Sequence, residues 1–191
     1  MFRRVASCLA FAFCLGWCCR ATLAQEVVHA LTGTVSAIDD QAKTITVFLD
    51  GGDLGVFKDM TNTKTSLSVD KKLLSDTTTA DDFKKKGAYV LVFYFSDGHA
   101  RTAVALRSLG PGPFTAVTGA VTDFKGRRSI SVVDKTGATQ TFDLSSSTVA
   151  EGGYGAVNGM KFQAEKGDHV RVVGSASQNG EPLALFVTQT M

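Results

Sequence analysis

Few residues of this chain combine the type and the spacing that chemistry requires. Its four cysteines all lie within the first 19 residues, and its three histidines, His29, His99 and His169, share no spacing with one another. The sequence contains neither a Gly-x-Ser-x-Gly nucleophile motif nor a His-Glu-x-x-His zinc motif. We therefore expect a protein that is not an enzyme and that has no cofactor and no metal site.

Three polar segments could in principle bind ions, but each has a simpler explanation. Asp50 and Asp53 enclose two glycines and are not followed by the glutamate that closes an EF-hand, so this segment predicts an ordinary turn. Residues 151–159 are rich in glycine but lack the Gly-Lys-Ser/Thr ending of a phosphate loop. The three lysines at 84–86 follow two aspartates, a pattern typical of a solvated surface.

The first 24 residues predict a secretory signal peptide. Arg3 and Arg4 precede an apolar stretch at 5–17, and small residues ending at Ala24 offer a cleavage point. The apolar stretch is shorter than the roughly 20 residues that a transmembrane helix needs. We expect cleavage after Ala24, a periplasmic or secreted protein, and no membrane span after cleavage.

Removal of this leader would change the chemistry of the remaining 167 residues. The cleaved chain would lose every cysteine, which excludes disulfides, thiolate metal sites and cysteine nucleophiles. It would also lose three arginines, leaving 17 Lys and Arg against 18 Asp and Glu and a net charge of −1. This charge disfavours nucleic-acid binding, which depends on positive charge. Lipid modification of Cys18 is an alternative fate of the leader, although Trp17 stands where such sites favour a small residue.

After the leader, the sequence contains an internal repeat of two copies. The segment LTGTVSAI at 31–38 returns as VTGAVTDF at 117–124, and the elements after each copy follow in the same order. Each copy predicts an alternating hairpin, a third strand, an irregular or helical excursion, and two further strands. The fold class is therefore all-β, with two tandem five-stranded barrels of the oligonucleotide/oligosaccharide-binding (OB) type.

The repeat also predicts the domain boundaries. We expect a first barrel at 25–109, a stiff Gly/Pro linker at 110–115 and a second barrel at 116–191. The expected strands of the first copy are 30–38, 43–49, 65–69, 87–92 and 101–106. Those of the second copy are 116–124, 128–133, 140–144, 167–172 and 181–186.

These motifs carry two resemblances. The succession Gly-x-Val-x-x-Ile/Phe, x-Ile-x-Val and Gly-Asp-x-Val-x-Val resembles exported bacterial barrel domains of unknown function that occur in tandem, and it covers nearly all of the chain after the leader. Residues 33–39 with 43–47 also resemble the small periplasmic copper- and silver-binding chaperones of efflux systems. That family implies a metal site of histidine, tryptophan and two methionines. Here Met60 stands alone and no tryptophan follows the leader, so no ligand is carried over.

The fourth strand differs between the two copies and contains the candidate binding face. Its inward positions are valines in both copies. Its other face reads Tyr89, Leu91, Phe93 and Phe95 in the first copy, but His169, Arg171, Val173 and Ser175 in the second. A strand that is apolar on both sides is normally covered on both sides. The first copy could pack against the second or against its own excursion around Phe83, or it could present a binding face to a protein or a flat ligand.

Together these features favour a non-enzymatic binding or scaffold protein of the bacterial envelope that acts through contacts on the barrel surface. Its expected partner is another envelope protein or a second copy of the chain. A periplasmic small-ligand or metal-ion carrier is the alternative function.

Overall fold

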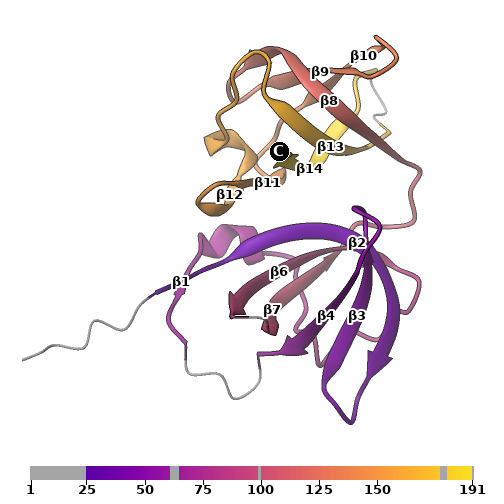
Figure 1. Cartoon of the computed structure of the whole chain (residues 1–191), viewed down its shortest axis with the longest axis vertical. Coiled ribbons are helices and arrows are strands. Elements are labelled where there is room, and N and C mark those ends of the chain that lie inside the picture. The colour runs from indigo at the N-terminus through magenta and orange to yellow at the C-terminus, as the bar shows by residue number, and fades with distance from the viewer. Residues whose placement is uncertain (1–24, 61–64, 99, 177–179, 191) are drawn as a thin grey trace, which may run out of the picture.

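The computed structural model describes residues 25–60, 65–98, 100–176 and 180–190, which form two stacked β domains (Figure 1). The expected leader and His99 lie outside the described residues. The only helical segments among the described residues are two short 3₁₀ helices, η1 (Lys71–Leu74) and η2 (Gly159–Lys161). The all-β expectation is therefore confirmed.

The first domain is a closed five-stranded barrel with the order β2-β3-β4-β7-β6. Its strands are β2 (His29–Asp39), β3 (Thr44–Leu49), β4 (Leu54–Asp59), β6 (Tyr89–Asp97) and β7 (Ala100–Ser108). All neighbours are antiparallel except β4 and β7, which pair in parallel and close the barrel. This strand order confirms the expected OB-like architecture.

The third strand of this barrel lies elsewhere than the sequence predicted. It is β4, which follows β3 directly through the turn at 50–53, whereas the expected strand at 65–69 is wrong. Two residues of that segment form β5 (Leu67–Ser68), which pairs in parallel with β1 (Glu26–Val27) outside the barrel. Hairpin pairing of adjacent strands explains the difference, because β4 has an immediate antiparallel partner in β3.

The second domain repeats this topology. Its barrel strands are β8 (Phe114–Lys125), β9 (Ser129–Asp134), β10 (Thr139–Asp143), β13 (His169–Ser175) and β14 (Leu183–Gln189). They follow the order β10-β9-β8-β13-β14, and a parallel contact between β10 and β14 closes the ring. A hairpin of β11 (Val149–Gly152) and β12 (Gly155–Asn158) extends this sheet beyond β14. Because β8 begins at Phe114, the last two residues of the expected linker belong to a strand.

The interiors of the two barrels are built alike, with similar residues buried at equivalent positions. Phe57 and Phe142, each fully buried, occupy the same place on the third strand of their barrel. Both first strands contain a β-bulge at equivalent positions. At the bulge, the hydroxyl of Ser36 donates to the carbonyl of Thr46 over 3.1 Å, as Thr122 donates to Ser131 over 3.2 Å. The repeat in the sequence is thus a repeat of packing and of hydrogen bonds.

One glycine in each first strand is required by close backbone approach. A Cβ at Gly119 would lie 1.9 Å from the carbonyl oxygen of Val133, and one at Gly33 would lie 2.4 Å from that of Phe48. Neither gap can hold a side chain unless the neighbouring strand moves. This explains why both copies of the motif keep a glycine at this position.

Candidate functional site

The expected binding face on β6 is the surface through which the two barrels pack. Leu91 and Phe93 are fully buried and Phe95 is 3% exposed, whereas Tyr89 is half-buried. Leu91 and Phe93 belong to an apolar cluster that also contains residues of the second barrel, among them Val149, Val173 and Phe186. Of the three explanations that the sequence left open, this placement agrees with packing of the first copy against the second. Leu73, from the segment before β6, belongs to the same cluster, whereas Phe83 lies in the core of the first barrel.

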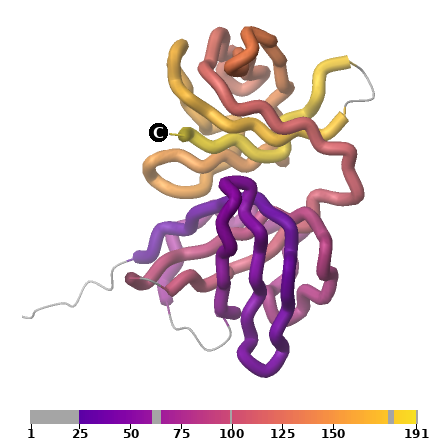
Figure 2. Tube along the Cα trace, turned by 45° about the vertical axis from the view of Figure 1, so that its right-hand side comes forward, coloured from indigo at the N-terminus to yellow at the C-terminus, as the bar shows by residue number. Residues whose placement is uncertain are grey.

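The two barrels contribute equivalent surfaces to this cluster. Val28, Phe93 and Ala105 come from the first barrel, and the register places Phe114, Val173 and Phe186 at the matching positions of the second. Figure 1 shows the consequence: β2 lies along the boundary, with β11 and β12 directly above it. The same arrangement is visible in Figure 2, where the loop of β11 and β12 lies over the first barrel. Residues at matching positions of the two barrels thus meet in one cluster, whereas the contacting strands differ, because β2 of the first barrel lies against β11, β12 and β14 of the second.

A polar network centred on Asp50 borders this interface. One oxygen of its carboxylate, Oδ2, accepts hydrogen bonds from Thr32 over 2.5 Å and from the Tyr89 hydroxyl over 2.6 Å. The same oxygen lies 2.9 Å from Nη2 of Arg171 in the second barrel, and both charged side chains are mostly buried. Burial, followed by the hydrogen bond to Asp50, raises the pKa of Tyr89 to about 12. The aspartate of the expected turn thus joins the two barrels.

A second polar contact crosses the interface at His29. Its Nδ1 lies 2.7 Å from Oε1 of Glu151, and the other carboxylate oxygen accepts the amide of Ala30 over 2.7 Å. Burial raises the pKa of the Glu151 carboxyl. Nearby, the amide of Ala156 donates to the carbonyl of Val28 over 2.7 Å. Backbone and side-chain bonds together fix the β11–β12 hairpin to β2.

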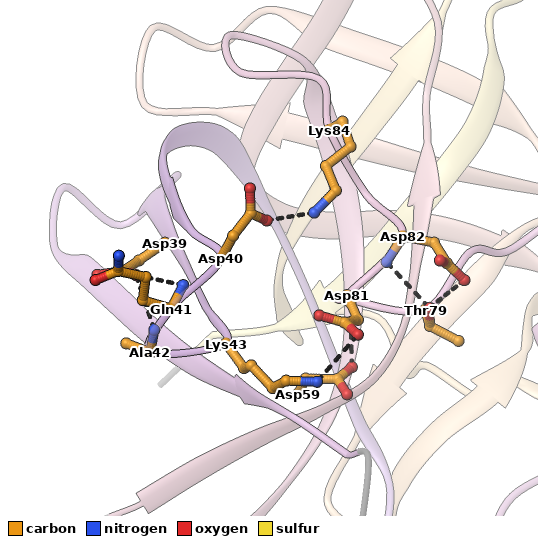
Figure 3. Close-up of polar contacts among 10 residues, drawn as sticks. All are labelled: Asp39, Asp40, Gln41, Ala42, Lys43, Asp59, Thr79, Asp81, Asp82 and Lys84. Carbon is orange, nitrogen blue, oxygen red and sulfur yellow. Dashed lines mark hydrogen bonds and ion pairs between the residues drawn. The ribbon is translucent and has the colours of Figure 1, made fainter.

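The loops of the first barrel carry a cluster of carboxylates and lysines (Figure 3). Lys43 pairs with Asp81 at 3.3 Å, and Lys84 pairs with Asp40, whose carboxylate raises the pKa of that lysine. The amide of Asp81 donates to Asp59 over 3.2 Å. These contacts fasten the turn at 40–43 to the excursion before β6. Among the described residues, no group of three or more His, Cys, Asp or Glu could hold a metal ion.

Two cavities meet at His169 on the second barrel. One, of about 510 Å³, is lined by Glu151, Asp168 and His169 together with glycines and polar residues of β11 and β14. The other, of about 680 Å³, lies over β8 and β9 around Gly119. His169 is exposed, so it faces solvent at the edge of both spaces.

The sequence did not predict the exposed apolar surface on β3 and β4. Phe48 is 52% exposed, Leu54 64% and Val56 54%, although all three lie on strands of a closed barrel. Phe48 is paired directly with Leu54, and Val56 is on the same face two residues along β4. We call these three residues the hairpin patch. The correct third strand would have revealed it, since alternation along residues 54–59 places Leu54 and Val56 opposite the buried Phe57.

Comparison with known proteins gives little further identification. No protein-family model matches the chain, and no curated protein matches it. Among solved structures, Drosophila Unr CSD456 aligns with a TM-score of 0.30 and 11% identity, over 85% of this chain and 61% of that chain. The alignment thus spans less than two thirds of that protein, and at this TM-score it carries no argument about function. Within the described residues, no helix is long and apolar enough to cross a membrane.

Proposed function

We propose that this chain is an exported, non-enzymatic binding or scaffold protein of the bacterial envelope whose contact surface is the hairpin patch. The observation that carries the proposal is the exposure of Phe48, Leu54 and Val56 side by side on one sheet face. Soluble monomers rarely expose contiguous apolar patches larger than roughly a few hundred Å², and exposed apolar patches of that kind commonly mark interaction sites. The leader at 1–24 supports export to the periplasm or the medium.

The structure changes which residues are assigned to this role. Tyr89, Leu91, Phe93 and Phe95 face the second barrel or are buried, so the proposed contacts belong instead to β3 and β4. The turn of the β3–β4 hairpin lies beside the second barrel, where Asp50 pairs with Arg171 (Figure 1). Phe48, Leu54 and Val56 are nevertheless each more than half exposed while the barrels are packed together, so a partner can reach the hairpin patch without separating them.

The alternative function is a carrier of a small ligand or a metal ion, and one observation favours a small ligand. The cavity of about 510 Å³ is lined by Glu151, Asp168 and His169. Both carboxylate oxygens of Glu151 are bonded to His29 and Ala30, which leaves Asp168 and His169 as the charged or titratable groups that would meet a small ligand there. A carrier would bind through this cavity on the second barrel and would not need the hairpin patch.

Native mass spectrometry of the protein, purified gently from the envelope fraction of its own host, tests both functions. A scaffold is expected to appear with a second polypeptide, and a carrier with a small added mass. The matched variants are Val56→Asp and Thr141→Asp, which alter equivalent outward positions of the two barrels. If binding uses the hairpin patch, only Val56→Asp loses the second polypeptide. Equal retention by both variants would contradict the proposed surface.

A further inference from the structure

We propose that the hairpin patch binds the hairpin patch of a second copy of this chain, across a two-fold axis that reverses the direction of the hairpin. The inference rests on the proposed function, since it takes this patch to be the contact surface and names its occupant.

The chemistry of the patch favours another apolar protein surface. Leu54 and Val56 offer no hydrogen-bonding groups, and Phe48 is the single aromatic side chain among the three. A sugar or a base requires stacking platforms together with polar groups that bind its edges. Aliphatic side chains beside a phenylalanine fit the apolar centre of a protein interface. The hairpin patch of a second copy is an apolar surface of this kind and of the same size.

The chain itself shows that such barrels associate through equivalent faces. Within one molecule, Phe93 of the first barrel and Val173 of the second occupy the same position and meet in one cluster. Outward apolar residues on matching strands thus form the apolar part of the barrel-to-barrel contact in this chain. The hairpin patch is a second surface of this kind, and it is left exposed by the packing within the chain.

The charges on β4 select the reversed arrangement. Asp53 lies at the turn before β4 and Lys58 near its other end, and both residues are exposed. Lys58 follows Asp53 by five positions, which in an extended strand sets the two residues about 17 Å apart, with Leu54 and Val56 between them. Reversal by a two-fold axis brings Lys58 of each copy toward Asp53 of the other. A parallel arrangement would set like charges against each other, which is unfavourable.

Association through this patch is expected to stop at two copies. An isologous contact uses the same patch on both molecules and leaves no second patch to continue the assembly. The equivalent positions on the second barrel are Val133, Thr139 and Thr141, of which two are polar. That barrel therefore offers no comparable surface for further growth.

Sedimentation velocity of the purified full chain over a range of concentrations tests the proposal. We expect a monomer–dimer equilibrium that Val56→Asp weakens by about a hundredfold, because it buries a charge at the centre of the contact. Thr141→Asp is the control and should leave the equilibrium unchanged. Circular dichroism of both variants establishes that they remain folded. A wild-type monomer at every concentration, open-ended aggregation, or a dimer indifferent to Val56→Asp would overturn the inference.

A charge exchange tests the direction of the two hairpins. Lys58→Asp and Asp53→Lys should each weaken the dimer by about threefold to tenfold, since both charges lie at the rim. The double variant should restore the dimer to near the wild-type constant, and failure to restore it would overturn the reversed arrangement. The outcome is separable from the proposed function. A monomeric protein that still captures a different polypeptide through Val56 would reject the second copy and retain the binding surface.

Discussion

The two barrels have nearly the same interior and clearly different exteriors. Their third strands bury Phe57 and Phe142 at one position, yet the outward residues beside them are Leu54 and Val56 in one barrel and Thr139 and Thr141 in the other. On the fourth strand the contrast is also outward, where the first barrel has Leu91 and the second has Arg171. Inward residues thus maintain the fold, and outward residues give each barrel its own contacts.

The largest loss of stability is expected when the equivalent buried phenylalanine of either barrel is truncated to alanine. Phe57→Ala and Phe142→Ala should each lower the free energy of unfolding by about 3–5 kcal/mol, because both rings are fully buried. Chemical denaturation of the two variants measures the loss. If one barrel tolerates the truncation and the other does not, the two interiors are not equivalent in energy.

The next test compares the stability cost of a charge on two outward faces of the first barrel. One face is covered by the second barrel, and the other is exposed to solvent. Phe93→Asp should cost about 3 kcal/mol of stability, since it places a charge in the cluster between the barrels. Phe48→Asp is its matched control, because Phe48 is an outward phenylalanine of the same barrel that is half-exposed. We expect this control to change stability by no more than about 0.5 kcal/mol. Thermal unfolding followed by calorimetry compares them, and equal losses would contradict the assignment of the two faces.

A smaller effect should follow from replacing the residue that makes the two fourth strands differ. Arg171→Met removes the ion pair with Asp50 across the interface and should cost about 2 kcal/mol, because the remaining carboxylate is mostly buried. Lys161→Met removes the pair with Asp70, whose side chains are more exposed, and should cost no more than about 0.5 kcal/mol. Urea titrations at one pH would show the difference. Similar losses of stability in both variants would mean that the ion pair at the interface stabilises the fold no more than an exposed ion pair does.

The smallest expected effect is a dependence on alkaline pH. The pKa of Tyr89 is about 12 in the folded chain, above the ordinary value of 10.0, because burial and Asp50 favour the neutral phenol. Its contribution to stability is therefore complete below pH 10 and is lost as the pH rises from 10 toward 12. Tyr89→Phe should lose less stability across this window. Ultraviolet titration checks the assignment, which fails if the variant retains the phenol that ionises near pH 12.

Alternation and repeated glycines were sufficient to predict the fold from the sequence. Gly33 and Gly119, with the strands around them, indicated two barrels because local spacing reflects the pleat of a strand. The third strand of the first copy was misplaced because residues 65–69 alternate as well as residues 54–59 do. Matching Phe57 to Phe142 would have resolved this choice.

The candidate site was harder to predict, because what covers a face depends on residues distant in the chain. The sequence showed that Phe93 is apolar and outward, but its cover includes Val173 and Phe186, about 80 and 90 residues later. Exposure of Phe48 could be recognised only once its neighbouring strand was known. Both features arise from tertiary packing, which local periodicity does not encode.

The short segment at 109–113 gives the interface between the two barrels a different response to dilution from that of the proposed contact between two molecules. It joins the barrels covalently, so their matching faces meet at an effective concentration in the millimolar range, whatever the abundance of the protein. The proposed contact between hairpin patches has no such tether, so its occupancy would follow mass action. If that proposal holds, the contact between the two barrels is independent of protein concentration, whereas the contact between two molecules rises with it.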